Sequence, residues 1–122
     1  MPTLAAVLVL VVAAIHVYIV VLEMFLWRTP RGMRAFGTDR PFADASSALA
    51  ANQGLYNGFL VAGVIWGLVA GGTIGFQVKV FFLACVFVAG LYGAATVNRR
   101  ILVVQALPGV LALIAVLAAG QA

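Results

Sequence analysis

Residues 4–27 read LAAVLVLVVAAIHVYIVVLEMFLW, a run that is almost as apolar as lipid. A helix needs about 20 apolar residues to cross a bilayer, and this run is long enough. The whole chain has 122 residues, of which 66% are hydrophobic and only 8% are charged. A soluble domain of this size could not bury so much apolar surface. The sequence therefore predicts an integral membrane protein.

Three further apolar segments follow, at residues 49–70, 78–97 and 101–119. With residues 4–27 they predict an all-α fold, in which residues 1–122 form a single domain, a four-helix membrane bundle. Residues 28–47 are polar and broken by prolines and glycines, so we expect a loop, with Asp44 to Ser47 capping the second span. We expect tight connections at residues 71–75 and 98–100, and a kink at Pro108.

The positive charges predict an orientation. Six arginines fall in residues 28–47 and 98–100, at positions 28, 31, 34, 40, 99 and 100, whereas only Lys79 falls on the other side. Cytoplasmic loops of membrane proteins carry an excess of Lys and Arg. We therefore expect a bacterial cytoplasmic (inner) membrane protein with both termini outside. The net charge of +4 then reflects topology rather than nucleic-acid binding.

His16 and Glu23 interrupt the first apolar run. They are seven residues apart, which puts them on one helix face about 10 Å apart. A titratable side chain at membrane depth is costly, so it is a functional hypothesis by default. Neutral imidazole beside a carboxylate suits proton transfer, which makes His16 and Glu23 the candidate catalytic pair. Whether Glu23 is ionised stays open.

Other polar side chains in the spans also fall near the cytoplasmic ends. They predict a pocket that opens to the cytoplasm, with His16 as its floor and arginines at its mouth that favour an anionic head group. The candidate ligand-binding residues are Asn52, Gln53, Tyr56, Asn57, Tyr92, Arg99, Arg100 and Gln105. The structural alternative is that the Asn, Gln and Tyr side chains only form hydrogen bonds between helices, and that Glu23 pairs with Arg28 or Arg100.

Small residues recur at helical spacing and predict close helix packing. Gly63, Gly67 and Gly71 share one face of the second span, and residues 89–94 supply another small face. Gly54 and Gly58 form a separate pair that could seat another helix or a second copy. Four short helices do not easily enclose a ligand-sized cavity, so we expect a homo-oligomer, a dimer or a trimer, in the lipid bilayer.

Several motifs together resemble the small bacterial membrane proteins catalogued as domain of unknown function number 1304. They are residues 16–27 (HVYIVVLEMFLW), residues 52–60 (NQGLYNGFL), Gly90 to Gly93, Arg99-Arg100, Gln105 and Pro108. The resemblance covers nearly the whole chain. It implies a multi-pass membrane protein and brings no established activity with it.

The size and the basic first loop are also similar to the membrane-associated eicosanoid and glutathione metabolism proteins and the styrene oxide isomerases. That weaker resemblance implies a trimer with cytoplasm-facing sites between protomers. Those proteins place a Glu after the Asn of the second helix, whereas Tyr56 and Asn57 follow Asn52 here. We therefore carry over no residue roles.

The leading functional prediction is a pocket for a small amphiphilic or lipophilic ligand, with isomerase-like or transferase-like acid–base chemistry left open. One alternative is a proton-coupled transporter, and another is a structural or partner-binding subunit. One His and one Cys supply no ligand set for zinc. A haem bound by His16 between protomers stays an alternative, and the cofactor is otherwise unknown.

Overall fold

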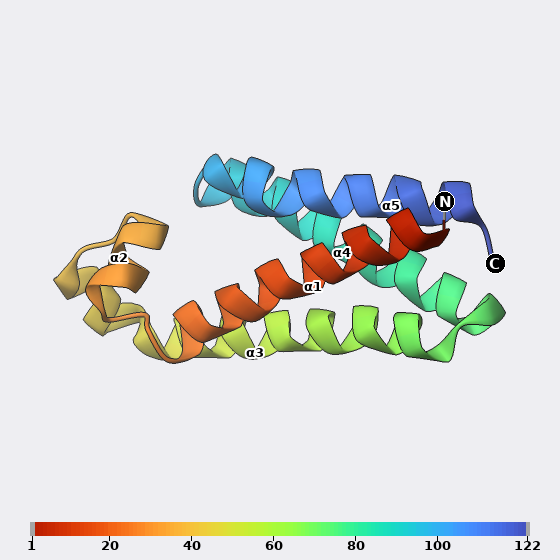
Figure 1. Ribbon diagram of the computed structural model, residues 1–122. Helices are drawn as coiled ribbons and strands as arrows, with labels where there is room; N and C mark the ends of the chain where they lie inside the picture. Colours follow the sequence, from red (N-terminus) through yellow and green to blue (C-terminus); the bar gives the residue numbers. More distant parts are fainter. Residues whose placement is uncertain (1, 122) are drawn as a thin grey trace. The chain divides into compact units, whose positions relative to one another are not determined.

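Helices make up almost all of the computed structural model, which describes residues 2–121. Their bounds are α1 Pro2–Met24, α2 Pro30–Phe36, α3 Arg40–Ala70, α4 Gly72–Thr96, a π-helical segment η1 Leu102–Ala106, and α5 Leu107–Ala119 (Figure 1). Within the described residues there is no β-strand. The all-α prediction is confirmed.

Four helical segments are long and apolar enough to cross a membrane: α1, α3, α4, and the continuous stretch of η1 and α5 from Leu102 to Ala119. Large apolar side chains lie on their outer surfaces, such as Val69, Val88 and Val103. Water would make this exposure costly, whereas lipid tails accommodate it. The chain is thus a multi-pass membrane protein.

The described chain divides into two compact units. Unit 1 comprises residues 2–15 and 60–121, and unit 2 comprises residues 16–59. Helices α1 and α3 contribute residues to both units.

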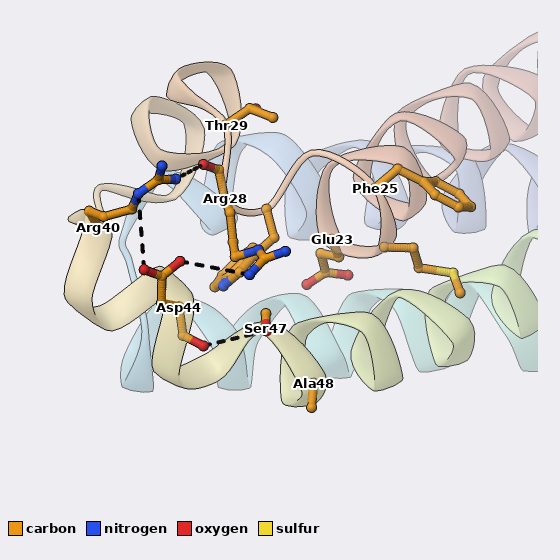
Figure 2. Close-up of a pocket in the computed structure, with 10 residues that line it drawn as sticks. Glu23, Phe25, Arg28, Thr29, Arg40, Asp44, Ser47 and Ala48 are labelled. Carbon is orange, nitrogen blue, oxygen red and sulfur yellow. Dashed lines mark hydrogen bonds and ion pairs between the residues drawn. The ribbon is translucent and has the colours of Figure 1, made fainter.

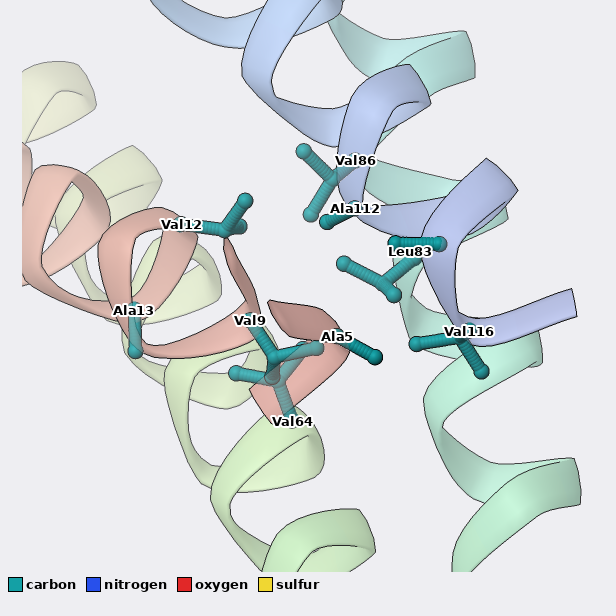
Figure 3. Close-up of a cluster of buried hydrophobic side chains, with 10 residues drawn as sticks. Ala5, Val9, Val12, Ala13, Val64, Leu83, Val86, Ala112 and Val116 are labelled. Carbon is teal, nitrogen blue, oxygen red and sulfur yellow. The ribbon is translucent and has the colours of Figure 1, made fainter. Parts of the chain in front are cut away.

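Unit 1 is a four-helix bundle with one apolar core. Small and β-branched side chains from four helical segments meet there, which allows the helices to approach closely (Figure 3). The fully buried members include Val9 from α1, Val64 from α3, Leu83 from α4 and Ala112 from α5. Packing of this kind, rather than hydrophobic collapse, is what holds helices together in lipid.

The turn between α3 and α4 is tighter than residues 71–75 predict. Only Gly71 separates the two helices, and Gly71 and Gly72 have φ angles of 63° and 60°. Glycine adopts this left-handed region without steric cost. The Thr73 hydroxyl donates to Gln121 Oε1 over 2.9 Å, which places Gln121 beside this turn within unit 1.

The predicted small-residue faces are used in helix packing within unit 1. A Cβ on Gly67 would meet the Lys79 backbone nitrogen at 3.0 Å, and one on Gly63 would meet the Phe82 ring. A Cβ on Gly90 would lie 2.7 Å from the backbone nitrogen of Ala106. Close packing therefore depends on bare backbone at these positions.

The irregularity predicted at Pro108 is a π-helical segment directly before it. Proline has no N–H to donate to the preceding turn. The N–H of Leu107 donates instead to the carbonyl of Leu102, five residues back. The Gln105 side chain in this segment donates to the Val86 carbonyl of α4 over 3.3 Å.

In unit 2, the predicted cap at residues 44–47 is wrong, because α3 already begins at Arg40. Asp39 Oδ1 accepts from the Phe42 N–H over 3.0 Å, and Pro41 fits a first helical turn. The segment between the first two spans also contains the short helix α2. Thr29 caps its start by accepting from the Gly32 N–H, and Gly37 ends it with a φ of 68°.

Candidate functional site

Unit 2 contains an open pocket of about 730 Å³. One wall is the end of α1 with the segment that follows it, and the other is the beginning of α3 (Figure 2). The lining residues are Glu23, Met24, Phe25, Trp27, Arg28, Thr29, Arg40, Asp44, Ser47 and Ala48. The volume falls within the range of about 300–1,000 Å³ typical of small-molecule sites.

The first wall is shaped by the way α1 ends. After Met24 the N–H groups of Phe25 and Leu26 both donate to the Val21 carbonyl, at 3.0 and 3.1 Å. The Trp27 indole N–H donates to Ser46 Oγ of α3 over 3.1 Å. The Trp27 ring also packs against Phe36 with a centroid distance of 4.9 Å. These contacts fix the segment after α1 against the start of α3.

Asp44 lies between two arginines at the pocket. Its Oδ1 is 4.0 Å from Arg28 Nη1 and its Oδ2 is 4.0 Å from Arg40 Nε. Arg40 Nη1 also donates to the Arg28 carbonyl over 2.7 Å. The three side chains are between 51% and 66% exposed, so the ion pairs are solvent-screened and contribute little to stability. The two guanidinium groups can therefore exchange partners at small cost.

Glu23 is the pocket group held by a short hydrogen bond. Asn57 Nδ2 of α3 donates to Glu23 Oε1 over 2.7 Å. This approach requires Gly54, because a Cβ there would run into the Met24 side chain and lie 3.2 Å from Glu23 Cβ. Within unit 2 no arginine lies within ion-pair distance of Glu23, so the pairing with Arg28 considered from the sequence is not formed.

His16 is buried, with 2% of its surface exposed, two turns before Glu23 on α1. The lining of the pocket, which runs from Glu23 to Ala48, does not include it. The structure thus brings Glu23 to the pocket and leaves His16 in the packed part of the helix.

The predicted residues of α3 separate into two groups. Asn57 contacts Glu23, whereas Asn52, Gln53 and Tyr56 are exposed and lie outside the pocket lining. The Tyr56 ring packs against Phe59 with a centroid distance of 6.0 Å.

The remaining predicted residues belong to unit 1. Tyr92 is 72% exposed near the end of α4, and Arg99 and Arg100 are exposed in the connection that follows. Gln105 makes the helix-to-helix hydrogen bond to Val86, which is the packing role considered for it as an alternative. One site formed by all ten predicted residues stays a prediction.

Comparisons with known proteins give the family. Residues 10–117 match the family model described as Protein of unknown function (DUF1304). The chain belongs to the DUF1304 family. It is 33% identical over 116 residues to the uncharacterized protein YpaA of Lactococcus lactis subsp. lactis (strain IL1403), a match that covers 93% of this chain and 97% of that protein. No solved structure matches the chain.

The family resemblance read from the sequence is confirmed, and the family description leaves function to be argued from the site. For this DUF1304 protein, sequence reasoning missed seven of the pocket residues: Met24, Phe25, Trp27, Thr29, Asp44, Ser47 and Ala48. The signal for Asp44 was its position four residues after Arg40, a spacing at which opposite charges on a helix meet. Within residues 2–121, no three His, Cys, Asp or Glu side chains gather as a metal-ion site.

Proposed function

We propose that this DUF1304 protein binds a small amphiphilic or lipophilic molecule in the pocket of unit 2. The observation that carries the proposal is the lining itself. A carboxyl group from Glu23 and two guanidinium groups, Arg28 and Arg40, border the same space as the apolar side chains of Met24 and Phe25. Pockets that orient amphiphiles combine an apolar wall with a few convergent polar groups.

The position of the pocket along the helices supports this proposal. Glu23 is the penultimate residue of α1, a 23-residue helix that is about 35 Å long and so spans the hydrocarbon core. The pocket then lies at the membrane boundary, where an amphiphile places its head group. The arginine excess on this side supports a cytoplasmic orientation in a bacterial inner membrane.

Binding has more support than catalysis. Acid–base chemistry by His16 and Glu23 requires both side chains at one substrate, and only Glu23 lines the pocket. The transporter alternative has less support, because its essential carboxyl group has to be reached from both sides and Glu23 lies at one end of α1. The structural-subunit alternative predicts no saturable ligand binding.

The test uses Trp27, which lines the pocket, as a fluorescent reporter. The chain has two tryptophans, so Trp66→Phe leaves Trp27 as the only one. The protein is placed in lipid nanodiscs and titrated with bromoundecanol, whose bromine quenches indole fluorescence on contact. We expect saturable quenching, because a pocket has a fixed capacity whereas the bilayer does not.

A matched pair of variants separates the pocket from the surrounding lipid. Ala48→Phe adds a ring inside the lining, and Ala45→Phe adds the same ring on exposed α3 surface outside it. Ala48→Phe should abolish the saturable quenching and Ala45→Phe should retain it. Quenching that rises without saturation and is equal in all three proteins would contradict the proposal.

A further inference from the structure

The arrangement of Asp44 between Arg28 and Arg40 points to the chemistry of the ligand. The two arginines come from different segments, one after α1 and one in the first turn of α3. Figure 2 shows both directed to the same carboxylate. Two guanidinium groups that converge on one carboxylate at the edge of a pocket form a receptor for an oxyanion.

The Asp44 carboxylate is bound only weakly by the two arginines. Both contacts to Asp44 are at 4.0 Å, outside the 2.7–2.9 Å range of good charged hydrogen bonds. Arg28 and Arg40 are 63% and 66% exposed, so their remaining N–H groups face solvent. A free oxyanion can approach both groups more closely than a side chain tethered to α3.

The rest of the lining gives the bound molecule a direction. Ser47, whose hydroxyl can donate to an oxyanion, also lines the pocket, and its Oγ donates to the Asp44 carbonyl over a long 3.4 Å. In Figure 2 Phe25 lies at the opposite end of the pocket from Arg40. Glu23 lies between them, and its Oε1 already accepts from Asn57 Nδ2 over 2.7 Å. An oxyanion head at the arginines therefore leaves an apolar tail toward Phe25.

We propose that the pocket selects amphiphiles with an oxyanion head, a phosphate or a carboxylate, and that Asp44 is the internal anion which the head displaces from Arg28 and Arg40. This inference rests on the proposed function, since it names the class of ligand for the same pocket. Asp44 thereby weakens binding while keeping the two arginines in place.

The experiment compares three probes that share one tail and differ in the head. Bromoundecyl phosphate, bromoundecanol and bromoundecylamine are titrated into the Trp66→Phe protein in nanodiscs of zwitterionic lipid. We expect the phosphate to bind about tenfold tighter than the alcohol, the effect of one charge-assisted hydrogen-bond set. We expect the amine to bind no tighter than the alcohol, and the advantage of the phosphate to shrink in high salt.

Asp44→Asn removes the internal anion with almost no change of shape. It should tighten binding of the phosphate severalfold and leave the alcohol unchanged. Arg28→Gln and Arg40→Gln should each reduce the advantage of the phosphate. Arg34→Gln is the matched control, because Arg34 is an exposed arginine of α2 outside the lining. If an arginine variant fails to fold, Asp44→Asn still tests whether Asp44 competes with the oxyanion head.

The outcomes separate the two proposals. Equal affinity for phosphate and alcohol, with both saturable, overturns the oxyanion inference and leaves the proposed function standing. Weaker phosphate binding by Asp44→Asn overturns the role of Asp44. No saturable binding of any probe overturns the proposed function itself.

A second arm identifies the source of the head group. Nanodiscs that contain phosphatidylglycerol supply an oxyanion from the bilayer. If a membrane lipid is the occupant, these discs should weaken binding of the phosphate probe in the wild-type protein and less so in Arg40→Gln. If the occupant is a free amphiphile, the two kinds of disc should give the same affinity, and the oxyanion selectivity is supported in both cases.

Discussion

Glu23 shows how single residues fix a polar group at a membrane boundary. Its carboxyl group is held from α3 by Asn57, and Gly54 lets the two helices approach at that point. Asn52 lies on the same helix but is exposed. The two asparagines therefore lie in different surroundings, although they are only five residues apart. Only Asn57 should be energetically coupled to Glu23.

A double-mutant cycle tests that coupling. Glu23→Ala combined with Asn57→Ala should show an interaction free energy on the order of 1 kcal/mol, the value of a hydrogen bond between membrane helices. The readout is the free energy of unfolding in mixed detergent micelles. The cycle of Glu23→Ala with Asn52→Ala should give a value near zero, and equal coupling for both asparagines would contradict the contact.

Gly54 carries a steric prediction of its own. Gly54→Val should destabilise the protein by about 1–3 kcal/mol, because the new side chain overpacks against Met24 and Glu23. Gly58 is the matched control, since a Cβ there meets nothing within 4 Å. Gly58→Val should leave the unfolding free energy of the single chain nearly unchanged. A larger loss at Gly58 than at Gly54, measured in the same micelles, would show that this packing is wrong.

At the scale of helices, α4 and η1 approach closely at Gly90. A Cβ there would lie 2.7 Å from the backbone nitrogen of Ala106, and backbone cannot move aside as a side chain can. At Gly93 the nearest atoms belong to the Ile101 side chain at 3.3 Å. The two glycines thus differ in what a methyl group would meet, although they lie one turn apart on the same helix.

Gly90→Ala should therefore cost about 1–3 kcal/mol and Gly93→Ala clearly less. Thermal unfolding followed by circular dichroism in detergent is a suitable measurement. Equal losses for the two variants would contradict this difference in packing. A gain of stability at both sites would mean that helix propensity, which favours Ala over Gly, dominates over packing.

The helical elements could be predicted from the sequence because the bilayer imposes a simple rule, about 20 apolar residues per span. The start of α3 could not, because Asp39, Pro41 and Asp44 all suit the first turn of a helix, and the sequence does not say that Asp39 is the residue that caps it. The segment α2 was missed since it has only seven residues, which begin with Pro30 and contain Gly32.

The candidate site was predictable only in part. Glu23 and Asn57 stand out as polar side chains in apolar helices, so the sequence singled them out. The lining residues Phe25, Trp27, Arg28 and Thr29 come from the reversal after α1, where the N–H groups of Phe25 and Leu26 share one acceptor. Composition carries no signal for such a turn. The role of Asp44 depends on Arg40, four residues before it on α3, and on Arg28, whose approach follows from that turn.

For the molecule as a whole, the charge distribution predicts one orientation. Six arginines on one side against Lys79 on the other should place α2 in the cytoplasm and the N-terminus outside. In a Cys85→Ser background, Thr3→Cys and Ala35→Cys supply one exposed thiol on each side. In intact bacterial cells a membrane-impermeant maleimide should label Thr3→Cys, and should label Ala35→Cys only after lysis.

The control for this labelling is the Cys85→Ser protein, which should stay unlabelled in both preparations because it has no thiol. Labelling of Ala35→Cys in intact cells, with protection of Thr3→Cys, would reverse the orientation and would place the pocket on the outer face. Partial labelling of both positions would indicate a mixed population, which a six-to-one charge bias argues against.

The single residue between α3 and α4 also constrains how the protein is made. One residue reaches less than 4 Å, far short of the roughly 30 Å of a bilayer core. Helix α4 therefore starts at the membrane surface where α3 ends. The connection is too short for α4 to remain in water after α3 has inserted. We expect the two helices to leave the ribosome separately but to enter the bilayer together, as one preformed hairpin that turns on Gly71 and Gly72.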